Sequence, residues 1–186
     1  MKNLSDRLKE ISSFIEEHQI RSLSLDIDGT VYSLGKVENR WRRNFFHSPI
    51  KSLRFLSIRK KWEKRRKGEA IQILPEDVVE FETYLESLLD ESLVPKEIRD
   101  WLRSLELDIY FLTDHGGTVK LRKLNLQGVV IDCLHETGEL KPHFRISQVL
   151  KEKFFIVPEK HLHLGDRWTD EAQAKLLGSY FQYLKP

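Results

Sequence analysis

The chain has 186 residues and a formal net charge of +2, and hydrophobic and charged residues make up 40% and 32% of it. This composition is typical of a globular protein with one core, and it lacks the apolar run of about 20 residues that would span a membrane. We therefore expect no membrane partner. The one cysteine excludes a disulfide within the chain and indicates a cytoplasmic protein.

The N-terminal part predicts one helix and one strand. Apolar residues recur there at helical spacing and predict an amphipathic helix over residues 5–18, not a signal peptide. Residues 22–27 form a short apolar run, which predicts a strand. This strand ends at an Asp-Gly pair, residues 28–29.

The following segment, residues 35–91, has no convincing strand pattern and indicates helices. Ser48 and Pro49 suit the N-cap and first turn of a helix that runs to about Lys67, and residues 75–89 predict a second helix. We expect the aromatic residues to form mostly a small core of their own, with one or two lining a ligand pocket. These residues are Trp41, Phe45, Phe46, Trp62 and Tyr84.

Charge is segregated within this segment. Almost all charged residues in 36–67 are basic, whereas those in 69–90 are all acidic. One interpretation is that two helix faces of opposite sign pair with each other. The other is that the basic helix faces an anionic ligand.

The rest of the chain alternates short apolar runs with helical patterns. Strands are predicted at residues 107–112, 128–133 and 161–164, and helices at 96–105, 117–124, 144–153 and 170–177. This alternation predicts an α/β fold, a Rossmann-like three-layer parallel sheet with a small helical insertion. Such sheets carry their active sites at the carboxyl ends of the strands.

Asp26 and Asp28 lie two residues apart at the end of the first predicted strand. In an extended segment their side chains point to the same side, so both carboxylates can converge on one pocket. A close carboxylate pair repels itself unless a cation lies beside it, and Mg²⁺ is the usual hard cation for oxygen ligands. Taken alone, the pattern also fits a turn in which the aspartates serve only the local backbone.

Three later sites follow strands in the same way. Thr113 ends a strand, where its hydroxyl and the amides that follow, from Asp114 on, suit a phosphoryl oxygen. Lys141 precedes a helix and can neutralise a transferring phosphoryl group. Asp166 and Asp170 follow the last predicted strand and can hold a metal. Each site alone also fits a local role: a turn, a surface lysine, or an acidic first turn of a helix.

Together these motifs resemble those of the haloacid dehalogenase-like hydrolase superfamily, whose members are mostly phosphatases. The matching residues are 26–30 (DIDGT), Thr113, Lys141-Pro142, and Gly165-Asp166 with Asp170. The resemblance covers about residues 20–32 and 95–184. It implies a core domain of residues 1–34 and 92–186, with a helical cap domain of residues 35–91 inserted between the first two motifs.

By this resemblance, Asp26 is the nucleophile that forms an aspartyl-phosphate, and Asp28 is the general acid and base. The phosphoryl group is bound by Thr113, Asp114 and Lys141. The Mg²⁺ site consists of Asp26, Asp28, Asp166 and Asp170, with Asp28 contributing its backbone carbonyl. The implied function is a Mg²⁺-dependent phosphatase that acts on a small anionic phosphorylated substrate.

Other functions stay open beside this one. Asp28 argues against the dehalogenase branch of the superfamily, which lacks this acid, and against the ion pumps, which have threonine there. A phosphotransferase or mutase would use the same residues. A module that binds nucleic acid or protein through the basic segment is a further alternative, although the complete motif set argues against such a module and so against a nucleic-acid partner. The basic segment suggests a strongly anionic substrate, such as a sugar phosphate or nucleotide.

Overall fold

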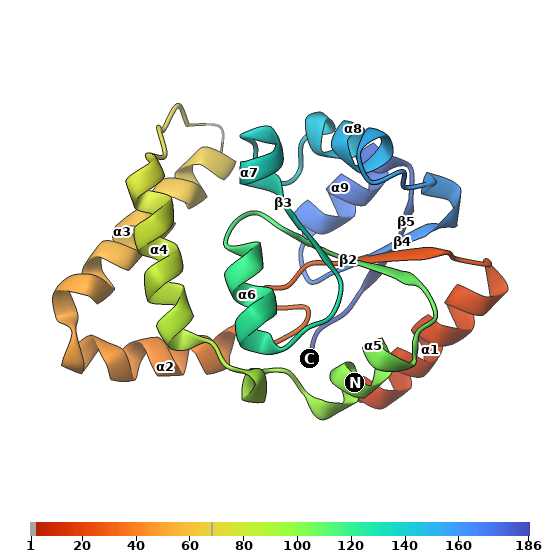
Figure 1. Ribbon diagram of the computed structural model, residues 1–186, viewed down its shortest axis with the longest axis horizontal. Helices are drawn as coiled ribbons and strands as arrows, with labels where there is room; N and C mark the ends of the chain where they lie inside the picture. Colours follow the sequence, from red (N-terminus) through yellow and green to blue (C-terminus); the bar gives the residue numbers. More distant parts are fainter. Residues whose placement is uncertain (1–2, 68) are drawn as a thin grey trace.

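The computed structural model describes residues 3–67 and 69–186, and its centre is a five-stranded sheet (Figure 1). The strands lie in the order β3-β2-β1-β4-β5, and every neighbouring pair is parallel. Their bounds are β1 Ser22–Leu25, β2 Asp108–Thr113, β3 Val129–Asp132, β4 His161–Gly165 and β5 Tyr180–Tyr183. The predicted α/β class with a parallel sheet is confirmed.

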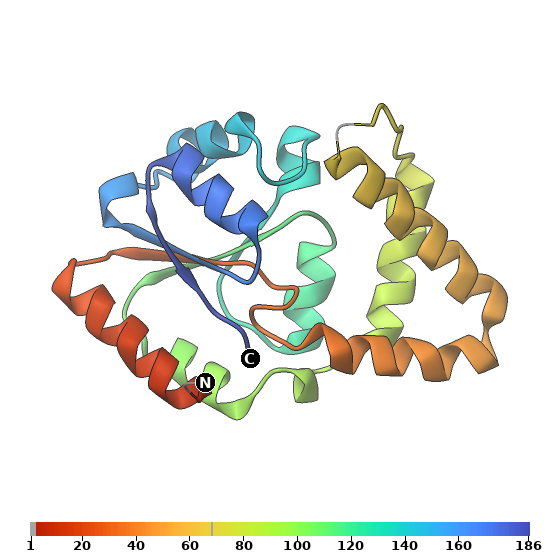
Figure 2. The same cartoon turned by 180° about the vertical axis from the view of Figure 1, so that it is seen from behind.

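Helices cover both faces of the sheet (Figures 1 and 2). One face carries α1 (Leu4–Glu17), α5 (Lys96–Ser104) and α6 (Gly117–Leu124), and the other carries α8 (Phe144–Glu152) and α9 (Trp168–Leu177). The chain changes face after β3 because right-handed crossovers toward the two opposite edges of a parallel sheet lie on opposite faces. The short elements are α7 (Cys133–Thr137), η1 (Glu91–Leu93) and η2 (Pro158–Lys160).

Three helices between β1 and β2 lie to one side of the sheet (Figures 1 and 2). They are α2 (Leu34–His47), α3 (Pro49–Arg66) and α4 (Pro75–Leu88), and we call residues 34–88 the helical insertion. Ile58, Trp62 and Leu88 of the insertion belong to the same buried hydrophobic cluster as Leu23 and Phe111 of the sheet. The insertion is therefore packed against the core. A separate cap domain with the limits 35–91 stays a prediction.

The strand predictions differ from the structure at several strand ends and in one missed strand. β1 ends at Leu25, before the predicted end at residue 27. β3 ends at Asp132, because its side chain accepts a hydrogen bond from the His135 N–H at 3.2 Å and so caps α7, which takes Cys133 out of the strand. The prediction missed β5, a short edge strand that is only partly buried and so lacks a clear apolar run.

The segregated charges of the insertion pair across two helices. Arg54 Nε lies 2.6 Å from Glu80 Oε2, and Lys61 Nζ lies 2.8 Å from Asp77 Oδ2. Both ion pairs join α3 to α4. The structure thus favours the interpretation in which two helix faces of opposite sign neutralise each other.

The aromatic residues of the insertion divide into two groups. Trp62 and Tyr84 are buried, as expected for a small core. Phe46 is 86% exposed and lies outside that core. It lies near the end of α2, one residue after Phe45, on the side of the helix that the packing leaves open to solvent.

A buried polar group joins β1 to β4. His161 Nδ1 lies 2.7 Å from Ser22 Oγ, and His161 Nε2 lies 2.8 Å from Ser24 Oγ. Ser24 Oγ also lies 2.6 Å from His163 Nδ1. Burial, assisted by the neighbouring His163, lowers the pKa of His161 from 6.5 to about 3. His161 is therefore neutral in the folded protein at pH values where the unfolded chain protonates it.

We expect the protein to lose stability through His161 as the pH falls below 6.5. Between that value and about pH 3, the unfolded chain binds a proton at His161 that the folded chain does not, so unfolding becomes more favourable. The effect reaches roughly 2 kcal/mol at about pH 5. Urea unfolding measures this effect as the difference in free energy of unfolding between wild type and His161→Gln. We expect the advantage of wild type to shrink by that amount between about pH 8 and pH 5. An advantage independent of pH would contradict this.

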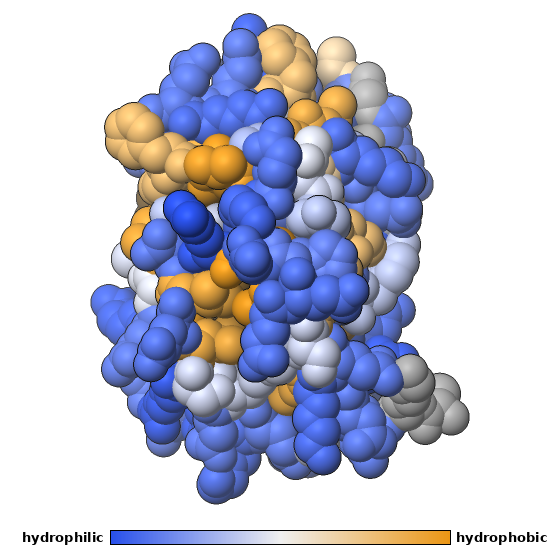
Figure 3. All heavy atoms as spheres, turned by 90° about the vertical axis from the view of Figure 1, so that its right-hand side faces the viewer, coloured by the Kyte–Doolittle hydropathy of each residue, from blue (hydrophilic) through white to orange (hydrophobic). Residues whose placement is uncertain are grey.

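The surface farthest from the insertion is mainly hydrophilic, with a patch of hydrophobic side chains (Figure 3). Exposed hydrophobic residues of the described chain include Phe155 and Val157, in the segment that follows α8. Scattered residues of this kind are normal on protein surfaces. Among the described residues, no helix has both the length and the hydrophobicity needed to cross a membrane.

Candidate active site

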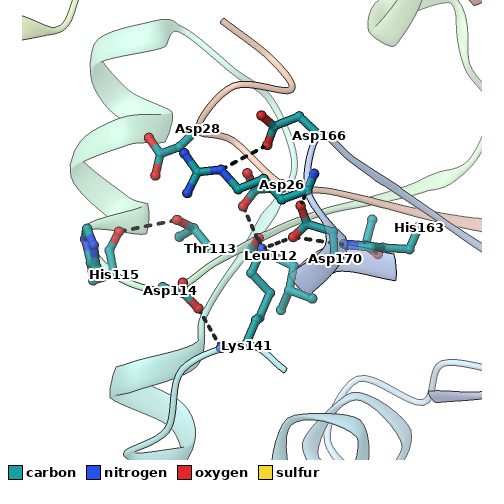
Figure 4. Close-up of polar contacts among 12 residues, drawn as sticks. Asp26, Asp28, Leu112, Thr113, Asp114, His115, Lys141, His163, Asp166 and Asp170 are labelled. Atoms are coloured by element: carbon teal, nitrogen blue, oxygen red, sulfur yellow. Dashed lines mark hydrogen bonds and ion pairs between the residues drawn. The ribbon is translucent and has the colours of Figure 1, made fainter. Parts of the chain in front are cut away.

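The predicted site residues meet at the carboxyl end of the sheet (Figure 4). Leu25, the last residue of β1, pairs with β2 on one side and with Leu164 of β4 on the other. Asp26 follows directly, and its backbone N–H donates to the Leu164 carbonyl at 2.9 Å. Because β1 is the central strand, Asp26 lies between the ends of β2 and β4, where Thr113 and Asp166 are found.

Lys141 joins two carboxylates of this site. Its side chain is only 3% exposed, and Nζ donates to Asp26 Oδ1 at 2.6 Å, to Asp170 Oδ1 at 2.7 Å and to the Leu112 carbonyl at 3.1 Å. These contacts use all three donors of the ammonium group. The Lys141 backbone N–H donates to Asp114 Oδ1 at 2.8 Å. Asp114 therefore holds the loop of Lys141, and the Lys141 ammonium group is shared by the two carboxylates.

Burial perturbs the ionisation of these groups. It raises the pKa of Asp26 to about 7, and Asp170 adds to the rise although Lys141 opposes it. Burial also acts to raise the pKa of Asp170, but Lys141 holds it well below its usual range. The pKa of Lys141 lies well above 10.5, because the two carboxylates outweigh the effect of burial. One lysine therefore compensates the charge on Asp26 only in part.

Three carboxylates form a group that fits a hard divalent cation. One oxygen from each of Asp26, Asp166 and Asp170 lies within 4.8 Å of the other two. Asp166 Oδ1 is buried and accepts no hydrogen bond from the described residues, and it lies 3.7 Å from Arg167 Nε. A buried carboxylate oxygen without a donor is costly, and oxygen-only donor sets suit Mg²⁺. The residues present therefore fit this ion.

Two glycines allow the carboxylates to approach the backbone. Gly29 has a φ of +91°, and a Cβ there would lie 2.5 Å from Asp166 Oδ2. A Cβ at Gly165 would lie 2.2 Å from the Cβ of Asp170. Gly29 and Gly165 are thus required by the close packing of the acids and not only by turns.

We expect Gly165→Ala to displace Asp170 and weaken Mg²⁺ binding by roughly 10-fold to 100-fold, the range seen when the surroundings of a metal ligand are disturbed. Stability should fall by about 1–3 kcal/mol, because a methyl group is forced into a filled space. Calorimetric titration with Mg²⁺ and thermal unfolding measure the two effects. Gly35→Ala is the matched control, since the nearest contact of its Cβ would be Ser33 Oγ at 3.7 Å. Equal Mg²⁺ affinity in both variants would contradict the assigned packing.

Asp28 lies apart from the three clustered carboxylates (Figure 4). Its Oδ2 accepts a hydrogen bond from Lys120 Nζ at 2.5 Å, and its Oδ1 accepts one from the Tyr32 hydroxyl. Burial acts to raise the pKa of Asp28, but Lys120 holds it well below its usual range. The carboxyl group is therefore ionised in this arrangement. Because β1 has already ended at Leu25, Asp26 and Asp28 do not share the same partners.

Thr113 is fully buried behind the site. Its Oγ1 accepts a hydrogen bond from Lys120 Nζ at 2.9 Å and donates to the His115 carbonyl at 3.4 Å. Lys120 therefore bridges Thr113, at the end of β2, and Asp28, which follows β1.

A cavity of about 260 Å³, which we call the acidic cavity, opens onto these groups. Five of the seven predicted site residues line it, namely Asp26, Asp28, Asp114, Lys141 and Asp170. Of the other two, Asp166 belongs to the carboxylate group and Thr113 lies behind the cavity wall. The structure thus brings all seven residues to one end of the sheet.

Sequence reasoning did not single out Lys120 or Tyr32. A signal for Lys120 was present, because Gly117, Lys120 and Leu124 are the buried positions of α6 and follow helical spacing. A lysine on the buried stripe of a helix needs a charged partner. Tyr32 carried no such signal, since a buried tyrosine after a turn is ordinary in a hydrophobic core.

Comparisons with known proteins give structural likeness only. No protein-family model and no curated protein matches the chain. Among solved structures, CbbY from Rhodobacter sphaeroides in complex with phosphate is 14% identical, with a TM-score of 0.61 over 90% of this chain and 87% of that one. A β-phosphoglucomutase from Clostridium difficile is 16% identical, with a TM-score of 0.57 over 87% and 83%. An L-2-haloacid dehalogenase is 14% identical, with a TM-score of 0.60 over 89% and 85%.

These structures match most of this chain, because the coverage reaches nine-tenths of its length. At such low identities the likeness concerns the arrangement of helices and strands. The parallel sheet with helices on both faces therefore has the haloacid dehalogenase-like fold.

Proposed function

We propose that the protein is a Mg²⁺-dependent phosphatase that hydrolyses a small phosphomonoester through an aspartyl-phosphate. The observation that carries this proposal is the group of Asp26, Asp166 and Asp170 at a cavity that Asp28 and Lys141 also line. These residues supply a nucleophile, metal ligands, an acid and base, and a neutralising cation. Neighbours of the same fold include a protein solved with phosphate and a phosphoglucomutase, which supports phosphoryl chemistry.

In the first step, a carboxylate oxygen of Asp26 attacks phosphorus, and the bond from phosphorus to the leaving alcohol breaks. Lys141 Nζ donates to Asp26 Oδ1 and so fixes the orientation of the Asp26 carboxylate. Bound Mg²⁺ supplies neutralisation of the phosphoryl charge. Asp28 is ionised beside Lys120, so it must first leave Lys120 and take up a proton from solvent. It then gives this proton to the leaving oxygen.

In the second step, a water molecule attacks the phosphorus of the aspartyl-phosphate. Asp28 accepts the proton of this water, the bond between phosphorus and Asp26 breaks, and inorganic phosphate leaves. Asp28 is ionised after the first step, so it is ready to act as the base. Thr113, together with Lys120, fixes the loop whose amides face the phosphoryl group in this proposal.

The helical insertion completes the proposal. We assign the predicted cap domain, residues 35–91, which contains most of this insertion, the role of covering the site, excluding water and selecting the substrate. The single, buried Cys133 supports a cytoplasmic location.

A phosphotransferase or mutase is the second candidate, because one structural neighbour is a phosphoglucomutase and the same residues would serve. It differs only in the acceptor that attacks the aspartyl-phosphate. Product analysis with a phosphorylated acceptor separates the two reactions: inorganic phosphate identifies hydrolysis, and a newly phosphorylated acceptor identifies transfer. A dehalogenase is disfavoured because that branch of the resembled superfamily lacks the acid present here as Asp28.

Removal of divalent cations tests the proposal. We expect hydrolysis of a generic aryl phosphate in the presence of Mg²⁺, a loss of about 100-fold or more after chelation, and recovery when Mg²⁺ is restored. Calorimetric titration of the chelated protein should show one Mg²⁺ site, which Asp166→Asn removes. Hydrolysis that continues at the same rate without divalent cations would overturn the assignment of the carboxylate group.

A further inference from the structure

A second cavity, of about 200 Å³, lies between the helical insertion and the core, and we call it the aromatic cavity. Asp28, Glu63 and Arg167 line both this cavity and the acidic cavity. In the proposed function, Asp28 must reach the oxygen that joins the phosphoryl group to the leaving alcohol. Because Asp28 lies where the two cavities meet, the phosphoryl group belongs in the acidic cavity and the alcohol in the aromatic cavity.

The walls of this cavity present flat apolar surfaces. Trp62 stacks on His115 with ring centroids 3.6 Å apart, and Phe55 stacks on Phe81 at 4.5 Å. Trp62 also meets Phe81 edge to face at 4.2 Å, so the rings hold one another in place. Trp41 lines the same cavity. Walls of this kind favour a flat ring. A cavity of about 150 Å³ already holds benzene, so this one has room for a two-ring system.

Two residues that line this cavity carry a hydrogen-bond donor for which the described residues offer no acceptor. The indole N–H groups of Trp41 and Trp62 are buried, and neither donates to any described residue. Trp62 is only 1% exposed. A buried donor without an acceptor costs about 1–3 kcal/mol, which an acceptor oxygen or nitrogen on a ligand would recover once the indole turns its N–H toward the cavity. The two groups therefore indicate a ring that carries acceptors.

The charges that line the aromatic cavity are already paired. Lys120 Nζ lies 2.5 Å from Asp28, and Arg59 Nε lies 3.4 Å from Glu63. Glu38 lies 3.0 Å from Arg42 on the same helix, and Arg167 Nε lies 3.7 Å from Asp166 Oδ1. In the arrangement that the structure shows, before Asp28 leaves Lys120, a second anionic group on the alcohol would have to break an existing ion pair. This balance argues against a bisphosphate or another polyanion, although the sequence of the insertion is basic.

We propose that the aromatic cavity selects phosphomonoesters of flat aromatic alcohols whose ring carries a hydrogen-bond acceptor and no further negative charge. This inference rests on the proposed phosphatase function, which gives Asp28 its place at the scissile bond. It adds the class of alcohol to that function and assigns Trp62 to its recognition.

Binding of the free alcohols tests the inference without any catalysis. The probes are 7-hydroxycoumarin, whose ring carries an acceptor carbonyl, 2-naphthol, which has a similar shape without it, and glucose. In calorimetric titrations we expect 7-hydroxycoumarin to bind roughly tenfold more tightly than 2-naphthol, the effect of one hydrogen bond. Glucose should show no binding at the same concentrations.

Variants then locate the site. Trp62→Phe keeps a ring and removes the donor. The affinity for 7-hydroxycoumarin should therefore fall roughly tenfold, to that for 2-naphthol, whereas the affinity for 2-naphthol should not change. Trp41→Phe is the second variant should Trp62→Phe fail to fold. Trp101→Phe is the matched control, because Trp101 Nε1 donates to Ser12 Oγ at 2.9 Å, outside the cavity, and it should alter neither affinity.

A substrate panel with Mg²⁺ separates the two levels of the proposal. The panel compares 7-coumarinyl phosphate with glucose 6-phosphate and fructose 1,6-bisphosphate, in wild type and Trp62→Phe. Binding of 7-hydroxycoumarin that depends on Trp62, with no phosphate released from any ester, supports the cavity assignment and overturns the phosphatase. Hydrolysis of the sugar phosphates, with no binding of either aromatic alcohol, overturns the cavity assignment and leaves the phosphatase standing.

Discussion

Asp26→Asn is expected to abolish phosphomonoester hydrolysis, lowering kcat/KM by about 10⁴-fold or more. The carboxamide is almost the same size as the carboxylate, but it cannot form the aspartyl-phosphate, and it removes one ligand of the proposed metal. Lys141 keeps its contacts with Asp170 and the Leu112 carbonyl, so the loop should stay in place. The loss would therefore come from the missing nucleophile.

Steady-state hydrolysis of an aryl phosphate measures this effect, and thermal unfolding checks the fold of the variant. Asp77→Asn is the matched control, because Asp77 pairs with Lys61 on the helical insertion and lines neither cavity. Mass spectrometry of rapidly quenched wild type should find a phosphorylated peptide that contains Asp26 and is absent from the variant. More than a tenth of the wild-type rate in Asp26→Asn would refute the assigned nucleophile.

Asp28→Asn is expected to lower kcat by about 10²-fold to 10⁴-fold, the usual contribution of a general acid and base. The size of the loss should depend on the leaving group. A nitrophenol needs little protonation to leave, so the first step with 4-nitrophenyl phosphate should survive, whereas the second step still lacks its base. The variant should therefore release nitrophenol in a burst close to one equivalent per enzyme, followed by slow turnover.

Stopped-flow absorbance measures this burst. Removing the charge of Asp28 leaves the buried Lys120 without its acidic partner, so the single variant should also be less stable. Lys120→Met in the same chain removes the unpaired charge and should restore stability without restoring turnover. A variant that turns over alkyl and aryl phosphates with equal losses and no burst would show that Asp28 is not the acid and base.

The order of elements was predictable because it depends on local patterns. Apolar runs that alternate with helical repeats predicted four of the five strands and the class of the sheet. Errors arose where a single side chain or an edge position overrides the pattern. Asp132 starts a helix by capping it, and Tyr180–Tyr183 is a strand because β4 offers it an edge to pair with. Neither effect is visible in apolar periodicity.

The site was predictable to a similar extent. Asp26, Thr113 and Asp166 each follow a strand, and a parallel sheet brings the carboxyl ends of its strands together. Residues that act across the fold were not predictable from these positions. Lys120 reaches Asp28 from a helix 92 positions later in the chain. The basic character of residues 36–67 pointed to an anionic ligand, and only the packing of α3 on α4 showed how much of it is paired within the protein.

The sequence by itself determined the α/β fold, the parallel sheet and the set of acids, threonine and lysine at its carboxyl end, because strand periodicity and motif spacing are local properties. The tertiary structure decided which groups are neighbours. It placed Lys141 between Asp26 and Asp170, held Asp28 on Lys120 and Tyr32, and enclosed Trp62 in an aromatic cavity. Ion pairing, burial and cavity shape depend on distances between residues far apart in the chain, and those distances exist only once the chain has folded.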